Sequence, residues 1–89
     1  MKIMAICGSG LGSSFMEEMN IKKVLKKMGV EADVEHSDLS SAIPSEADLF
    51  VMAKDIAASA SIPDNQLIVI TNIIDINELE TKLRAYFNK

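Results

Sequence analysis

The residues best suited to chemistry lie in one short segment near the amino terminus. It contains the only cysteine of the chain and reads Cys7-Gly8-Ser9-Gly10-Leu11-Gly12-Ser13-Ser14. A thiolate attacks where a thiol hardly does, and an unperturbed cysteine is only a few per cent ionised at pH 7. The glycines allow the backbone to form a concave nest of N–H groups, which would stabilise a thiolate and bind phosphoryl oxygens. We therefore interpret Cys7 as a nucleophile that carries a phosphoryl group.

The segment follows an apolar run and precedes a helical pattern, so it would lie at a helix amino terminus. The helix dipole alone contributes about 0.3–2 kcal/mol, so a strongly lowered thiol pKa also needs N–H donors aimed at the sulfur. A lone cysteine after an apolar strand is otherwise a small buried hydrophobic residue, but the glycines and serines favour an anion site. Ser14 and Glu17 also have the spacing of a capping box, which is compatible with phosphate contact.

The chain lacks an arginine that cysteine phosphatases of small domains have six residues after the nucleophile. That position is Ser13 here, followed by Ser14, and the only arginine is Arg84 near the carboxyl terminus. Without a bidentate guanidinium, the transition state for attack by water loses its main charge clamp. A phosphocysteine at Cys7 would therefore persist until another acceptor arrives.

The elements that must position this segment alternate between strands and helices. Apolar runs predict strands at 2–7, 49–53 and 67–70, and alternating polarity predicts an edge strand at 31–36. Helices are predicted at 13–28 and from Asp75 onward, with shorter turns within 40–47 and 55–61. The pattern predicts an α/β fold of three layers, α/β/α, whose four-stranded parallel sheet has the order 2-1-3-4. Strand 1 then ends at the switch point where ligands bind.

Residue types at the helix ends predict how the two main helices start and stop. In the first helix, Glu17 and Glu18 would lie in the first turn and suit the dipole, and Gly29 would end it. In the last helix, Asp75 with Glu78 has the capping-box spacing. The apolar face of the first helix is predicted to comprise Phe15, Met16, Met19, Val24, Leu25 and Met28.

Size and composition restrict the function. The chain has 89 residues, which predicts a single domain, 1–89, with no room for a separate substrate cavity of several hundred Å3. A net charge of −4 argues against nucleic acid or an anionic membrane surface as partner. With a single cysteine, the chain cannot form an internal disulfide. Its histidine, cysteine and carboxylate residues do not have the spacing of metal ligands, and no cofactor is implied. With no long apolar run, a cytoplasmic protein is expected.

The segment from Cys7 to Met16, with Met19-Asn20 beyond it, resembles the enzyme IIB components of the bacterial phosphoenolpyruvate-dependent sugar phosphotransferase system. The chain looks closest to the lactose/ascorbate group and, within it, to the L-ascorbate-specific IIB proteins. The resemblance implies that Cys7 accepts a phosphoryl group from the phosphohistidine of a IIA protein, while residues 8–14 form the phosphate loop. It also implies transfer to a sugar held by a membrane IIC permease, with which the domain would associate peripherally.

Three other functions stay open. A nucleotide-binding module is suggested by Gly8-x-Gly10, although the third glycine of that fingerprint would stand where Ser13 does. A low-molecular-weight phosphatase or thiol arsenate reductase would need the missing arginine or a second cysteine. A regulatory domain of the same fold would sense phosphorylation instead of relaying it. At the predicted rim, His36, Lys54-Asp55 and Thr71-Asn72 are interpreted as solvated or hydrogen-bonded surface residues, with a catalytic role conceivable for His36.

Overall fold

A computed structural model describes residues 1–7, 13–38, 42–71 and 75–88 of the chain. Its parallel sheet has the order β2-β1-β3-β4, which confirms the predicted fold and strand order. The strands are β1 (Lys2–Cys7), β2 (Asp33–Asp38), β3 (Leu49–Ala53) and β4 (Leu67–Ile70). The helices are α1 (Ser13–Met28), α2 (Lys54–Ala57) and α3 (Ile76–Phe87), with single 3-10 turns η2 (Pro44–Glu46) and η3 (Asp64–Gln66).

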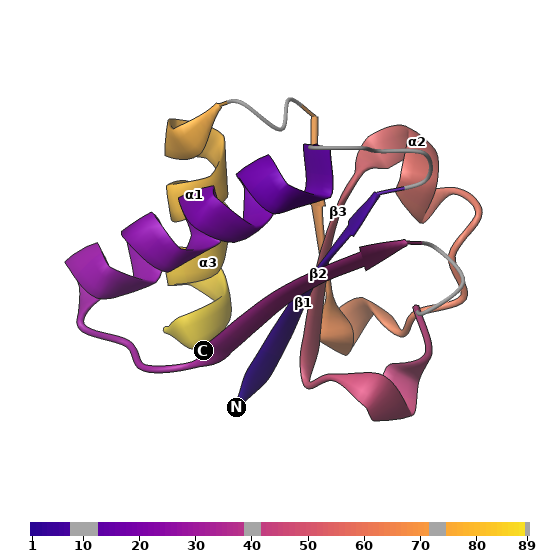
Figure 1. Ribbon diagram of the computed structural model, residues 1–89, viewed down its shortest axis with the longest axis horizontal. Helices are drawn as coiled ribbons and strands as arrows, with labels where there is room; N and C mark the ends of the chain where they lie inside the picture. Colours follow the sequence, from indigo (N-terminus) through magenta and orange to yellow (C-terminus); the bar gives the residue numbers. More distant parts are fainter. Residues whose placement is uncertain (8–12, 39–41, 72–74, 89) are drawn as a thin grey trace.

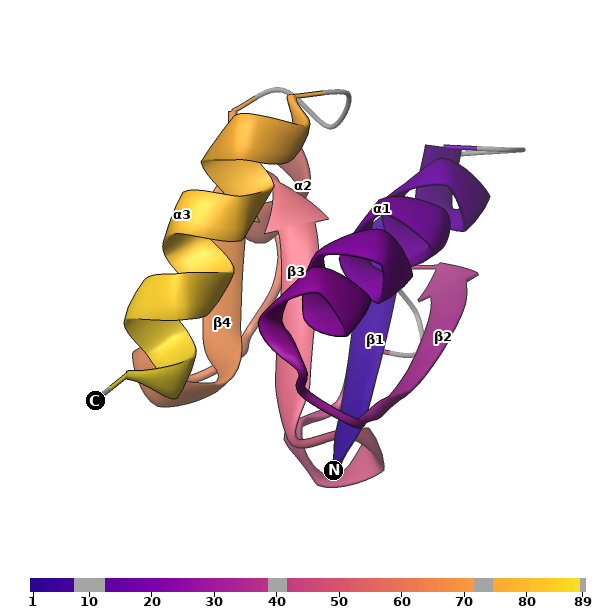
Figure 2. The same cartoon turned by 90° about the vertical axis from the view of Figure 1, so that its left-hand side faces the viewer.

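The sheet is covered on both faces. Helices α1 and α3 lie on one face, and the short helix α2 lies on the other (Figures 1 and 2). Successive side chains of a strand point to opposite faces, and the core divides accordingly. Ile3 and Ala5 of β1 belong to the core under α1 and α3, whereas Met4 and Ile6 belong to the core on the α2 side. Both faces of β1 are therefore buried, as its continuous apolar sequence predicts.

The strand register brings the carboxyl ends of the four strands to one rim of the sheet. Ala5 pairs with His36 and Cys7 pairs with Asp38, so the ends of β1 and β2 coincide. Met52 of β3 pairs with Ile6 on the other side of β1. The amino end of α1 lies near this same rim (Figure 1). The chain thus places the end of an inner strand beside the start of a helix, as the order 2-1-3-4 requires.

Gly29 ends α1 in a Schellman motif, as predicted. Its φ is 74°, its N–H donates to Lys26 O at 3.2 Å, and the N–H of Val30 donates to Leu25 O at 2.9 Å. The reversal occupies the residues up to Ala32, and Asp33 N then donates to Met1 O at 2.8 Å. Strand β2 consequently spans Asp33–Asp38, two residues later than the predicted 31–36.

The buried face of α1 differs from the predicted one. Met16 and Met19 are both 44% exposed, whereas Glu17 and Glu18 are buried. The buried stripe is set by Ile21 and the residues that follow it on the same face, and positions 17 and 18 continue that stripe one turn earlier. The prediction of core methionines at 16 and 19 is therefore wrong. The glutamates also lie in the second turn, because α1 begins at Ser13, so their predicted dipole role is wrong too.

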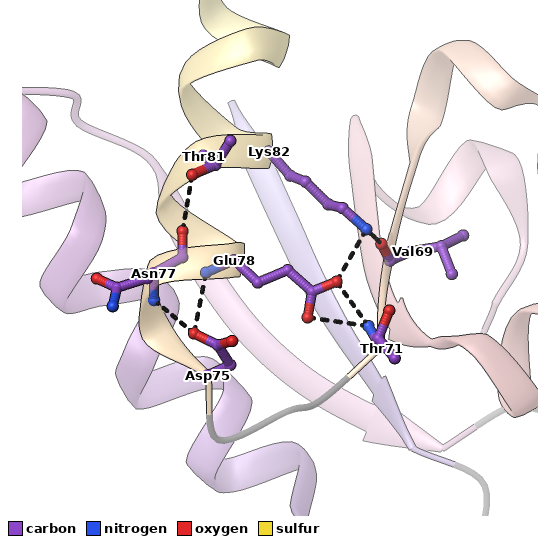
Figure 3. A network of polar contacts seen from close by, with 7 residues as sticks. All are labelled: Val69, Thr71, Asp75, Asn77, Glu78, Thr81 and Lys82. Atoms are coloured by element: carbon purple, nitrogen blue, oxygen red, sulfur yellow. Dashed lines mark hydrogen bonds and ion pairs between the residues drawn. The ribbon is translucent and has the colours of Figure 1, made fainter.

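Asp75 is the N-cap of α3, as predicted, but the described bonds of the Glu78 carboxylate go to Thr71 and Lys82, so only the Asp75 half of the predicted capping box is confirmed. The carboxylate of Asp75 accepts from the N–H groups of Asn77 and Glu78, each at 3.1 Å (Figure 3). These bonds satisfy two of the donors that a helix leaves unpaired at its start.

Glu78 connects the same end of α3 to the end of β4. Its carboxylate accepts from the N–H of Thr71 at 2.9 and 3.1 Å and from Lys82 Nζ at 3.1 Å (Figure 3). Lys82 Nζ also donates to the main-chain oxygen of Val69. The helix is thus tied to the carboxyl end of a strand, at the rim where β1 also ends.

Candidate functional site

The candidate site lies at the rim, between the end of β1 and the start of α1. Cys7 is the last residue of β1, and Ser13 and Ser14 are the first two residues of α1. The five predicted loop residues between them, Gly8, Ser9, Gly10, Leu11 and Gly12, lie outside the described residues, as do the side chains of Cys7, Ser13 and Ser14. The described backbone therefore provides the framework for an anion site, a strand end followed by a helix amino terminus.

The predicted capping box of Ser14 and Glu17 is wrong. Ser14 lies inside α1, one residue after its start, and not at the N-cap position. Glu17 Oε1 is buried and has no hydrogen-bond partner among the described residues. A capping box needs the serine at the N-cap, and Ser14 does not occupy that position.

Glu17 is a buried acid close to the site. Only 1% of the residue is exposed, and burial raises the pKa of its carboxyl from 4.5 to about 8. The carboxyl is therefore mostly protonated at neutral pH, because a charge there would lose its hydration without gaining a partner. Its position four residues before the buried Ile21 is the sequence signal that would have identified it.

Glu18, the neighbouring acid, is in the opposite state. Its Oε2 accepts from Lys22 Nζ at 2.8 Å, and its Oε1 lies 2.5 Å from His36 Nδ1. The hydrogen bonds from Lys22 and then His36 lower the pKa of the Glu18 carboxyl below its ordinary value. An ionised carboxylate only accepts, so His36 Nδ1 carries the proton of this bond. Sequence reasoning placed His36 at the rim but did not find this partner on α1.

The other predicted rim residues are surface residues. Lys54 and Asp55 are exposed and begin α2 directly after β3. Thr71 is exposed and its N–H is bonded to Glu78 as described above, while Asn72 lies outside the described residues. These positions agree with the prediction of solvated or hydrogen-bonded side chains.

The described surface has hollows, among them one beside β2 and one beside β4. One of about 390 Å3 follows the outer strand β2 and is lined by charged residues including Lys2, Glu35 and Glu46. Another of about 320 Å3 lies between β4 and α3, beside Leu67 and Tyr86. Among the described residues, no group of three or more histidine, cysteine and carboxylate side chains could hold a metal ion. No helix in the described ranges is both long and apolar enough to cross a bilayer.

The order of the strands, with the candidate site after the first of them, defines a fold class with known members. The structure is similar to the solution structure of a low molecular weight protein tyrosine phosphatase from Bacillus subtilis, with a TM-score of 0.55. The similarity covers 99% of this chain and 91% of that chain at 13% sequence identity, and it concerns the fold alone.

The sequence identifies a more particular family. Residues 2–85 match the family described as "PTS system, Lactose/Cellobiose specific IIB subunit". The chain therefore belongs to this IIB family of the sugar phosphotransferase system, which confirms the family resemblance.

Two relatives illustrate how such domains occur. The "Ascorbate-specific PTS system EIIB component" of Mycoplasma pneumoniae is 25% identical over 84 residues, which cover 91% of this chain and 88% of that protein. The "PTS system mannitol-specific cryptic EIICB component" of Escherichia coli K12 is 31% identical over 81 residues. That match covers 90% of this chain but only 17% of the mannitol protein, so the chain spans a small part of that relative.

Proposed function

We propose that Cys7 is the phosphoryl-carrying residue of this IIB component. The observation that carries the proposal is the position of the only cysteine in the chain, at the last residue of β1 and six residues before α1 begins. A strand end followed by a helix amino terminus offers unpaired N–H groups and a partial positive charge to an anion. A thiolate and a phosphorylated thiolate are both anions that such a site stabilises.

Two in-line transfers make up the proposed reaction. In the first, the Cys7 thiolate attacks the phosphorus of a phosphohistidine on a IIA protein, the S–P bond forms, and the P–N bond breaks. In the second, a sugar hydroxyl attacks the phosphorus, the O–P bond forms, and the S–P bond breaks to regenerate the thiolate. The hydroxyl proton passes to a base that we assign to the IIC protein, which holds the sugar.

The segment from Gly8 to Ser14 is proposed to cradle the phosphoryl oxygens. Its glycines permit a nest of main-chain N–H groups, and Ser9, Ser13 and Ser14 can add hydroxyl donors. Position 13 is serine where a phosphatase would have its arginine, so attack by water lacks a charge clamp. The phosphoryl group would consequently wait for the sugar instead of being hydrolysed.

L-Ascorbate is the proposed sugar, and residues 1–89 would act as one cytoplasmic domain at the membrane permease. Support for ascorbate comes from the Mycoplasma relative, because the match covers 88% of that protein. Mannitol is the competing substrate, supported by a relative of higher identity that matches over only 17% of its length.

The proposal is tested by phosphorylating the chain with phosphoenolpyruvate, the general phosphotransfer proteins and a matching IIA. Intact mass should rise by about 80 Da, the mass of one phosphoryl group. Cys7→Ser should abolish the increase, and Ser59→Ala, an exposed serine of the turn after α2, serves as the matched control. Phosphorylation that survives in Cys7→Ser would overturn the assignment.

The same preparation tests the acceptor and the rival functions. Discharge of the phosphorylated protein by IIC vesicles with L-ascorbate, but not with mannitol, would support the proposed sugar. Rapid loss of the phosphoryl group to water, without vesicles, would indicate a phosphatase. A stable phosphorylated form that no IIC vesicle discharges would instead favour the regulatory domain.

A further inference from the structure

The two ends of α1 are attached to the sheet by different kinds of contact. Toward its carboxyl end, Ile21, Val24 and Leu25 are buried in the apolar core against β1 and β3. In the turn that precedes Ile21, the buried side chains among those described are the two carboxyls of Glu17 and Glu18. Among the described side chains, the buried contacts near the candidate-site end of α1 are therefore made by carboxyl groups.

Within the part of the chain that the structure describes, Glu18 is the one of these two acids that bonds to the sheet. Glu17 Oε1 has no hydrogen-bond partner within the described ranges. Glu18 Oε1 accepts from His36 Nδ1 at 2.5 Å, a contact between α1 and the edge strand β2. The Glu18 side chain is 11% exposed and that of His36 is 46% exposed, so water screens this bond only from one side.

His36 is also close to the end of β1. It lies opposite Ala5 in the strand register, two positions before the pair formed by Cys7 and Asp38. With strands about 4.8 Å apart and a rise of about 3.3 Å per residue, the backbones of Cys7 and His36 are roughly 8 Å apart. The bond between Glu18 and His36 thus joins α1 to the edge strand β2, next to the strand that ends in Cys7.

We infer that Glu18 and His36 act as positioning residues for the phosphoryl site, by holding the amino-terminal turns of α1 at a fixed place over β1 and β2. The inference rests on the proposed function of Cys7 and deepens it. N–H donors stabilise an anion only when they point at it from hydrogen-bond distance, so a small displacement of the helix start weakens them. The apolar core at Ile21 and beyond would keep the fold intact while this happens.

The test uses the reactivity of Cys7, which is the only thiol in the chain. The rate of alkylation by iodoacetamide is measured between pH 5 and pH 10 for the wild type and for His36 variants. His36→Ala and His36→Val both remove the donor, and valine suits a strand. His36→Asn keeps an N–H close to the position of Nδ1 but cannot become charged near neutral pH.

The charged groups around His36 determine how the profiles are interpreted. Helix α1 contributes the Glu18 carboxylate and the Lys22 ammonium bound to it, and β1 contributes the uncharged Ala5 opposite. On β2 itself, Glu35 pairs with Lys2 at 3.5 Å. Glu35→Gln therefore serves as the matched control, because it breaks an ion pair on the same strand without touching α1.

The midpoint of each profile is the pH at which the alkylation rate of Cys7 reaches half its maximum. A positioning role predicts a higher midpoint in His36→Ala and His36→Val than in the wild type. The midpoint should return to the wild-type value in His36→Asn and should not change in Glu35→Gln. Phosphoryl transfer from IIA should fall by about tenfold in the first two variants and recover in the third. Unchanged midpoints in His36→Ala and His36→Val would overturn the inference, and so would failure of His36→Asn to restore them, since the imidazolium charge would then be responsible. The two claims fail in different experiments. The alkylation profiles test the positioning role of His36, whereas failure of IIA to phosphorylate the wild type would refute the proposed function.

Discussion

Replacing Glu17 should remove a large pH dependence from the stability of the fold. The folded protein binds the Glu17 proton more tightly than the unfolded chain does, because burial raises the pKa from 4.5 to about 8. The unfolded chain therefore releases this proton first as pH rises. The stability linked to Glu17 is fully present below pH 4.5, decreases between pH 4.5 and pH 8, and is constant above pH 8.

The size of the effect follows from the width of that pH window. Each pH unit inside it costs about 1.4 kcal/mol of unfolding free energy. From 4.5 to neutral pH this amounts to about 3 kcal/mol, a large part of the 5–15 kcal/mol typical of a small domain. Glu17→Leu removes both the titration and the unpartnered Oε1, whereas Glu17→Gln removes the titration and keeps a buried polar group.

Urea denaturation at pH 5, 6, 7 and 8 measures the prediction. The stability of Glu17→Leu relative to the wild type should increase by about 2–3 kcal/mol between pH 5 and pH 7. Glu17→Gln should show the same increase in stability relative to the wild type, but its stability at pH 5 should be lower than that of Glu17→Leu. Glu31→Gln, which replaces an exposed acid, should show no increase. If the wild type and Glu17→Leu keep a constant difference across this range, Glu17 is not a buried protonated acid in solution and the reasoning fails.

Five further substitutions test how α1 and α3 are held. Asp75→Ala should cost about 1 kcal/mol of unfolding free energy, because it leaves the N–H groups of the first turn of α3 unpaired. Gly29→Ala should cost about 1–2 kcal/mol of unfolding free energy because of the φ of 74° alone, since an added Cβ meets no atom within 4 Å. Gly29→Asn should cost less, because asparagine adopts this backbone conformation more readily. Equal losses in the two variants would contradict a backbone origin. Met19→Ala should change stability by less than about 0.5 kcal/mol, while Ile21→Ala should cost about 2–5 kcal/mol; similar values by urea denaturation would contradict the observed buried face of α1.

The position of the buried strand β3 and the ends of the helices could be predicted because local sequence determines them. The run from Leu49 to Ala53 is apolar throughout, as a strand buried on both faces requires, and it occupies the predicted residues. Gly29 and Asp75 end and begin helices through bonds within a few residues of themselves. Strand β2 starts two residues later than predicted because Glu31 and Ala32, which differ in polarity as neighbours in a half-buried strand do, belong to the reversal after Gly29.

The polar contacts of α1 could not be predicted, because they depend on packing between distant residues. A count of apolar residues favours Met16 and Met19 over Glu17 and Glu18 as the buried face. The buried face is set by Ile21 and the apolar positions after it, and it includes whatever residues continue their stripe. The partner of His36 is a residue eighteen positions earlier, and no spacing rule links a strand residue to a helix residue at that separation.

The pairing of Glu18 also bears on how a phosphorylated form could be tolerated. A phosphoryl group on Cys7 would carry about two negative charges, and an isolated carboxylate in the second turn of α1 would repel it. Lys22 and His36 instead surround the Glu18 carboxylate with donors at 2.8 and 2.5 Å. Lys22 offsets its charge, while the bond to His36 holds it toward the edge strand. A carboxylate placed this way can fix a helix next to a phosphoryl site, and its neighbour Glu17 avoids the same repulsion by remaining protonated at neutral pH.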